Sequence, residues 1–422
     1  MINMLYNIVD RIYIGHIPEV GALALTGVGV CMPLIMILSA FAALVGNGGA
    51  PRASILLGKG DSRSAEKIIG NCFTLQILIS IVLTVIMLLG GKTFLLAFGA
   101  SENTIEYAVS YFNIYAIGTI FVQLTLGMNM FITAQGFTKI GMYSVLIGAV
   151  INIMLDPIFI FACGLGVRGA ALATILSQGC SCIWVLHFLF GKKTTLRIKK
   201  ENLRLVPKVF LPCLALGASL FIMQASESVI SVCFNSSLLK YGGDVAVGAM
   251  TILTSVMQFA MLPLQGLGQG AQPIMSYNYG AKNPDRVKGA FFLLLKASLV
   301  SIILWAFIMI FPQVFAGIFT TDAVLLAFTK KALRIYLAAM FLFGIQISCQ
   351  MAFNSLGKAL SSIVVAVVRK FVLLIPLIYI MPAVLQDKTS AVYMAEPVAD
   401  TIAVTFTAIL FFFQFRKAMK EI

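Results

Sequence analysis

The chain has 422 residues, of which 60% are hydrophobic and only 11% are charged, with a formal net charge of +14 and a mean hydropathy of +0.99. A soluble domain cannot hide this much apolar surface, so the composition excludes a soluble protein and indicates one that lies within a membrane. In such a protein a strongly basic balance reports membrane topology and contact with anionic lipids, and it argues against nucleic-acid binding.

The apolar runs have the length of membrane-spanning helices. Runs of roughly 20 residues cross a hydrocarbon layer of about 30 Å, whereas the strands of a transmembrane barrel are about ten residues long and alternate in polarity. The predicted fold class is therefore an all-α membrane protein with about twelve transmembrane helices. The expected spans are residues 2–14, 22–44, 71–89, 107–131, 140–161 and 170–190, followed by 209–239, 245–267, 290–315, 332–352, 363–385 and 391–415.

The first expected span, residues 2–14, is too short to cross a bilayer, because a helix of that length rises only about 20 Å. It also lacks the basic leader and the small-residue cleavage site of a signal peptide. We therefore expect an in-frame extension of about one to two dozen residues upstream of Met1.

A motif of glycines and a proline occurs twice with the same spacing, as Gly46-x-Gly48-x-x-Pro51 with Gly58 and as Gly268-x-Gly270-x-x-Pro273 with Gly280. Each copy follows an apolar run and precedes a basic segment, which is typical of transporters built from two related halves. We expect two pseudo-symmetric six-helix bundles around a central cleft, with about twelve helices in all. The predicted ranges are 1–191 for the N-terminal bundle with a truncated first helix, 192–206 for a basic linker, and 207–422 for the C-terminal bundle.

Lysine and arginine collect on alternate loops and are densest around the linker, which we interpret as a solvated cytoplasmic loop. Because positive residues remain on the cytoplasmic side during insertion, we expect the linker and the C-terminus to face the cytoplasm, in a multi-pass protein of the cell (inner) membrane. The basic residues in and around the linker are Lys192, Lys193, Arg197, Lys199, Lys200, Arg204 and Lys208.

Few ionisable or strongly polar side chains fall inside the spans. Burying such a group in hydrocarbon is costly and is rarely tolerated unless the group has a task. The candidates are Asp10, Asn152, Asp156, Glu227, Arg369, Lys370, Glu396 and Asp400.

Asn152 and Asp156 are four residues apart, so their side chains lie on one helical face, and Pro157 leaves a nearby backbone carbonyl without its helical partner. If Asp10 meets this face, two carboxylates and an amide oxygen converge. Two such carboxylates must share a proton or hold a hard cation such as sodium, which prefers oxygen ligands. The alternative is that each acid only hydrogen-bonds a neighbouring helix.

The charged side chains of the second half allow two interpretations. Arg369 and Lys370 are expected to snorkel to the membrane interface, or else to pair with Asp400 or Glu227. Glu396 and Asp400 are four residues apart. We expect them either to line a vestibule of the C-terminal bundle or to tie two helices together.

Nothing in the sequence indicates an enzyme. The eight cysteines and two histidines lack the spacing of a metal or redox site, and there is no Ser-His-Asp arrangement, HExxH motif or nucleotide-binding glycine loop. We expect no catalytic residue and no cofactor other than a coupling ion.

An ordered set of short motifs resembles the multidrug and toxic compound extrusion (MATE) family, in its bacterial form, over essentially the whole chain. The motifs are Val9-Asp10 with Ile14-Gly15, Ala134-Gln135-Gly136 with Thr138-Lys139, Asn152 with Asp156-Pro157-Ile158-Phe159, Gly169-Ala170-Ala171-Leu172-Ala173-Thr174, Gly270-Ala271-Gln272-Pro273 with Tyr277-Asn278-Tyr279-Gly280, and Pro397 with Asp400.

The resemblance implies an efflux antiporter that exports cationic or amphipathic organic compounds in exchange for Na+ or H+. It further implies a cation-coupling site, with Na+ as a possible ligand, at Asp10, Asn152, Asp156 and Thr174. Some relatives pair a glutamate of the seventh helix with an aspartate of the tenth helix. In this chain Glu227 matches the glutamate, but the tenth expected span, residues 332–352, contains Gln346 and Gln350 and no acid. Glu227, Asp400 and Arg369 remain candidates for a substrate site or a site in the C-terminal bundle.

The expected partners are small organic cations or amphipathic drugs and membrane lipids, and the protein is expected to act as a monomer. Two other function classes remain open. A flippase for lipid-linked saccharides has a related architecture but usually lines its cavity with several arginines or lysines that hold pyrophosphate. A membrane-embedded enzyme needs a catalytic histidine or paired acids at the interface.

Overall fold

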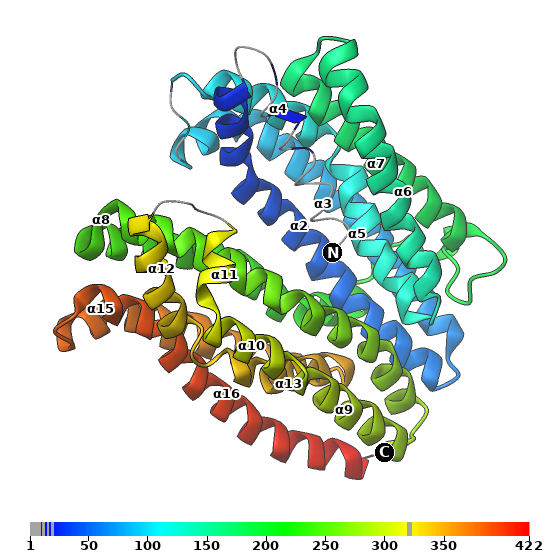
Figure 1. Cartoon of the computed structure of the whole chain (residues 1–422). Coiled ribbons are helices and arrows are strands. Elements are labelled where there is room, and N and C mark those ends of the chain that lie inside the picture. Colours follow the sequence, from blue (N-terminus) through cyan, green and yellow to red (C-terminus); the bar gives the residue numbers. More distant parts are fainter. Residues whose placement is uncertain are drawn as a thin grey trace. The chain divides into compact units, whose positions relative to one another are not determined.

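The computed structural model describes residues 10, 13, 14, 17, 21–98, 100, 102–318 and 323–421. Within these residues every regular element is a helix (Figure 1). In this part of the chain nine helices are long and apolar enough to cross a membrane, and two bent pairs of helices raise the number to eleven. The predicted all-α membrane fold is confirmed. Most of the first predicted span, residues 2–14, lies outside the described residues.

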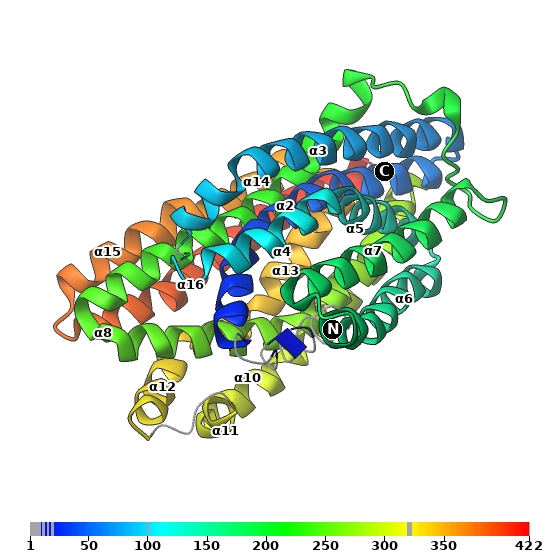
Figure 2. The same ribbon diagram turned by 90° about the horizontal axis from the view of Figure 1, so that it is seen from above.

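The chain divides into two compact units, Met1–Gly217 and Ala218–Ile422. In the first unit α2 packs against α3, α4 and α5, and α7 packs against α4, α5 and α6 (Figure 2). The elements of this unit are α2 (Gly21–Gly58), α3 (Ser62–Ala97), α4 (Ile105–Ile117), α5 (Thr119–Ala134), α6 (Thr138–Pro157), η1 (Ile158–Ala162), α7 (Gly166–Phe190), η2 (Lys200–Asn202) and the beginning of α8 (Pro207–Gly280).

The first copy of the glycine repeat lies inside α2, where the start of α8 comes very close. A Cβ atom on Gly48 would lie 1.9 Å from the carbonyl oxygen of Cys213, and one on Gly217 would lie 1.8 Å from that of Leu44. Only glycine allows two helix backbones to approach this closely. At Gly270, the equivalent of Gly48 in the second copy, a Cβ would meet no atom within 4 Å.

The predicted linker packs on the first unit and is not a simple solvated loop. Leu196 and Ile198 are buried in the core of that unit. The Thr74 hydroxyl of α3 donates a 2.8 Å hydrogen bond to the Leu203 carbonyl, and Lys199 forms a 2.6 Å ion pair with Glu66. These contacts explain why the first unit extends beyond the predicted linker (192–206) into α8.

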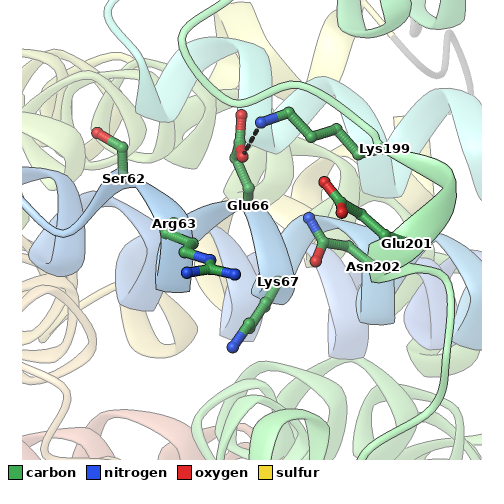
Figure 3. A pocket seen from close by; sticks show the side chains of 7 residues that line it. All are labelled: Ser62, Arg63, Glu66, Lys67, Lys199, Glu201 and Asn202. Atoms are coloured by element: carbon green, nitrogen blue, oxygen red, sulfur yellow. Dashed lines mark hydrogen bonds and ion pairs between the residues drawn. The ribbon is translucent and has the colours of Figure 1, made fainter.

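Where the linker crosses α3, it leaves a surface pocket with a volume of about 520 Å³ (Figure 3). Three basic and two acidic side chains surround it, so its charge is nearly balanced. The lining residues are Ser62, Arg63, Glu66, Lys67, Lys199, Glu201 and Asn202.

In the second unit α16 packs against α12, α13, α14 and α15, and α13 also contacts α9. Two helices make up α8, which breaks at Gly243, a residue with φ 64° and ψ −163°. Backbone with a positive φ favours glycine. The remaining elements are α9 (Pro284–Leu299), α10 (Ser301–Ile310), α11 (Pro312–Gly317), α12 (Ala323–Tyr336), η3 (Met340–Leu342), α13 (Phe343–Ser355), α14 (Ala359–Val367), η4 (Val368–Leu374), α15 (Ile375–Val384) and α16 (Lys388–Glu421).

Two predicted spans are bent. Residues 107–131 form α4 and α5, which meet at 55°, and the segment around residues 332–352 forms α12 and α13 with a 44° bend. The predicted span 22–44 also continues as helix to Gly58, with Pro33 and Pro51 inside α2. Hydropathy reports how long an apolar run is, but it does not report its curvature.

Candidate functional site

Four predicted site residues from separate parts of the first unit come together in its interior. Asp10 is 5% exposed, and Asn152 and Asp156 on α6 are fully buried. The Asn152 Nδ2 group donates a 3.2 Å hydrogen bond to Asp156 Oδ1. The Thr174 hydroxyl of α7 lies 3.4 Å from Asp10 Oδ2 and 3.0 Å from the Ala170 carbonyl oxygen of its own helix.

The carboxyl groups of Asp10 and Asp156 lie close enough to interact. Two ionised carboxylates repel each other and neither can donate a hydrogen bond, so their proximity favours a shared proton or a cation between the oxygens. Two further acceptors, Asn152 Oδ1 and Asp156 Oδ2, are buried and find no hydrogen-bond donor among the residues that the structure describes. The site therefore offers several oxygen acceptors to one small positive charge.

Local sequence explains how α6 presents this face. Asn152 and Asp156 lie one turn apart, and Pro157 ends the regular α-helix because it has no N–H to donate. The chain continues as the π-helical turn η1, in which the Cys163 amide donates a 2.8 Å hydrogen bond to the Ile158 carbonyl. Turns of this kind often occur at functional sites.

Tyr111 of α4 is a site neighbour that our sequence reasoning missed. Tyr111 is 2% exposed, and its side chain lies near Thr174, Asp10 and Tyr115. The Tyr111 and Tyr115 rings are stacked with centroids 6.3 Å apart. Two tyrosines spaced four residues apart in an apolar span are the signal that was available.

The second unit contains a buried cluster of charges. Arg369 donates from Nε to Asp400 Oδ1 at 2.7 Å, and its Nη2 lies 3.7 Å from Glu396 Oε1. All three residues are at most 7% exposed, and the guanidinium carbon lies 4.9 Å above the Phe343 ring. Asp400 and Glu396 thus tie α16 to η4.

Lys370 forms a second ion pair, with its Nζ 2.7 Å from Glu227 Oε1. Successive residues of a helix project in different directions, so in the π-helical turn η4 Arg369 can reach α16 while Lys370 reaches α8. The expected snorkelling of these two side chains is wrong, and the pairing alternative is correct, because each cation finds a carboxylate inside the unit. The side chain of Glu227 is nevertheless 59% exposed.

One family model matches most of the chain, and curated proteins resemble it over most of their length. A sequence profile described as MatE matches residues 1–158 and 219–380. The multidrug export protein MepA of Staphylococcus haemolyticus is 24% identical over 385 residues, which cover 90% of this chain and 83% of that protein. MepA of Staphylococcus aureus is 25% identical over 396 residues, or 91% of this chain and 84% of the relative.

Solved structures resemble this one over the whole chain. A crystal structure of MATE in the bent conformation has a TM-score of 0.93 at 22% identity and covers 100% of this chain and 93% of that one. A MOP superfamily transporter from Pyrococcus furiosus has a TM-score of 0.91 at 23% identity, with coverage of 99% and 93%. At this level of identity the likeness shows the fold.

Proposed function

The chain belongs to the MatE family, and from that premise we propose that it exports cationic or amphipathic organic compounds across the cell membrane in exchange for Na+ or H+. Its multi-pass helical structure is that of a membrane transporter. The proposed cargo class is supported by the staphylococcal relatives, which are multidrug export proteins.

The observation that carries the proposal is the buried contact between Asp10 and Asp156, with Asn152 and Thr174 beside it. A carboxylate pair without bound charge is unfavourable away from water, so the site binds one proton or one hard cation. Binding neutralises the negative charge that the carboxylate pair of Asp10 and Asp156 places inside the first unit. The same charge attracts a cationic substrate, so the coupling ion and the substrate compete for it.

This competition gives an exchange cycle. On the outer side Na+ or H+ binds the site and weakens the hold on the substrate, which leaves; the ion then departs inward and substrate binds again. Alternating access turns the exchange into transport. One positive charge moving down 100 mV supplies about 2.3 kcal/mol, and a tenfold concentration ratio supplies about 1.4 kcal/mol. Together they support a substrate gradient of roughly several hundredfold.

Efflux from proteoliposomes tests the proposal, first with a sodium gradient and then with a pH gradient. The gradient that drives export identifies the ion. Asp10→Asn and Asp156→Asn should each abolish ion-driven efflux while the protein remains folded, because either change removes one charge of the pair. Glu106→Gln, at an exposed acid on α4 of the same unit, is the matched control and should export normally. Undiminished efflux by both aspartate variants would reject the assignment.

Saccharide flipping receives less support from the geometry, because Arg369 and Lys370 are both engaged by carboxylates and are not available to hold pyrophosphate. We also propose that the linker and the C-terminus face the cytoplasm, from the distribution of lysine and arginine. A pump-deficient bacterium that carries the protein should gain resistance to ethidium or quaternary ammonium compounds, which neither a flippase nor an enzyme explains.

A further inference from the structure

A line of buried amide side chains runs along one face of α13 in the second unit. We propose that this face holds a file of water molecules that connects the buried carboxyl group of Glu396 with the end of the unit near Asn354. Only the statement that this end is cytoplasmic rests on the topology proposed above.

The amides form one continuous stripe. Gln346, Gln350 and Asn354 follow one another at intervals of four residues, so they lie on the same helical face. Their exposures are 2%, 3% and 0%. Phe343 lies one turn before Gln346 on this face and stacks under the Arg369 guanidinium at 4.9 Å. The stripe therefore begins beside the charged cluster and leads away from it.

The other faces of α13 are occupied by neighbouring helices. A Cβ atom on Gly344 would lie 3.0 Å from the Ser298 carbonyl of α9, and the Phe353 ring lies 5.2 Å from that of Phe411 on α16. A Cβ on Gly268 of α8 would lie 2.9 Å from Met351. Gly344 and Met351 project from the side of α13 opposite the amide stripe, and Phe353 lies at the edge of the stripe. The low exposure of the three amides places the stripe in the interior of the unit.

Polar groups of α8 lie close to the same interior. The Ser219 hydroxyl donates to Asn354 Oδ1 at 3.4 Å, and Gln272 and Ser276 follow Gly268 by one and two helical turns. Several buried polar atoms of the second unit have no hydrogen-bond partner among the described residues. They are Gln346 Oε1, Gln350 Nε2, Asn354 Nδ2, Gln272 Nε2, Ser276 Oγ, Ser362 Oγ and Glu396 Oε2.

The chemistry of these atoms identifies the ligand. A polar group in a membrane interior must find a partner, since hydrocarbon offers none. A metal cation satisfies only acceptors and an anion satisfies only donors, whereas this set includes amide donors, amide and carboxylate acceptors and hydroxyl groups. Water both donates and accepts, and buried waters typically bind two to four such groups.

Glu396 gives the file a function. Its Oε1 is only weakly held at 3.7 Å from Arg369, and its Oε2 is among the unpartnered atoms. A carboxyl group in contact with water can exchange a proton along the file, which gives the second unit a proton path of its own. The charged and titratable groups around Glu396 are Asp400, Arg369, Lys370, Glu227 and Tyr336.

Cysteine accessibility tests the path. The reference is a variant that keeps Cys349 as its single cysteine. Cys349 is as buried as Gln350, at 3%, but belongs to an apolar cluster. Gln346→Cys, Gln350→Cys and Asn354→Cys are then made one at a time with Cys349 also removed. A charged methanethiosulfonate reagent reacts with the thiolate, forms a mixed disulfide and releases methanesulfinate, so its rate reports access through water.

We expect each new cysteine to react at least about tenfold faster than Cys349. Reagent added to the cytoplasmic side should label position 354 first and position 346 last. Rates equal to that of Cys349, or position 346 reacting before position 354 from whichever side the reagent gains access, would overturn the proposal. If one variant fails to fold, the other two still provide the comparison. The reaction needs no substrate and no gradient, so its result is independent of whether the protein exports drugs.

Discussion

Replacing Arg369 by methionine should destabilise the second unit strongly. The change keeps an unbranched stem but removes the guanidinium that lies 2.7 Å from Asp400 and 3.7 Å from Glu396. Asp400, which holds the closer contact, is 2% exposed, so bulk solvent cannot take the place of the guanidinium. Breaking a buried ion pair from one side costs about 3–5 kcal/mol, because a charge is left uncompensated. Removing both members by Arg369→Met with Asp400→Asn should cost less than the sum of the single changes, by about 0.5–3 kcal/mol.

The assay is the midpoint of thermal unfolding in detergent, followed by the fluorescence of Trp305, which donates a hydrogen bond to the Leu337 carbonyl in the same unit. Lys331→Met provides the control, since Lys331 pairs with Asp387 at a similar distance, 3.0 Å, but with side chains 68% and 56% exposed. Such a surface pair contributes at most about 1 kcal/mol. If Arg369→Met shifts the midpoint no more than Lys331→Met, or if the shifts of Arg369→Met and Asp400→Asn simply add in the double variant, our account of the cluster is wrong.

Two further predictions concern backbone packing and helix capping. Gly48→Ala should greatly lower expression and thermal stability because its Cβ would overlap the Cys213 carbonyl at 1.9 Å, whereas Gly270→Ala should be neutral; equal effects would contradict this contact. Asp387 accepts hydrogen bonds from the Ser390 amide and hydroxyl at the start of α16, and these bonds lower the pKa of its carboxyl from 3.8 to about 2. Asp387→Ala should therefore cost about 1 kcal/mol at neutral pH, as lost N-caps do. Because the folded pKa is the lower one, the deficit should persist down to about pH 4 and shrink only as the pH falls toward 2. A deficit that instead changed between pH 5 and 8 would point to another group.

The sequence predicts those features that depend on local spacing. Apolar runs locate the helices, and the four-residue interval places Asn152 and Asp156 on one face. The meeting of Asp10 with Asp156 could be proposed because two acids in separate apolar spans have few favourable surroundings other than each other.

What escaped prediction depends on how helices approach one another. No proline marks the 55° bend between α4 and α5, and hydropathy does not register it. Whether Arg369 would snorkel or pair depends on the direction in which η4 projects it, and that direction follows from packing against α16. In the sequence, Gln346 and Gln350 could be noted only as amides in a span where some relatives have an acid. That some of their polar atoms lack a hydrogen-bond partner could not be predicted, because it depends on which helix faces them.

The packing of the linker and of the first turns of α8 on the first unit has a consequence for biosynthesis. Cys213 belongs to the core of that unit, and Gly217 contacts the backbone of α2. The amino-terminal half therefore cannot complete its core when its own last helix, α7, leaves the ribosome. It must wait until the opening helix of the other half has been translated and delivered to the bilayer. A break in the chain between α7 and α8 should therefore impair folding of the first unit, because it separates that unit from Cys213 and Gly217.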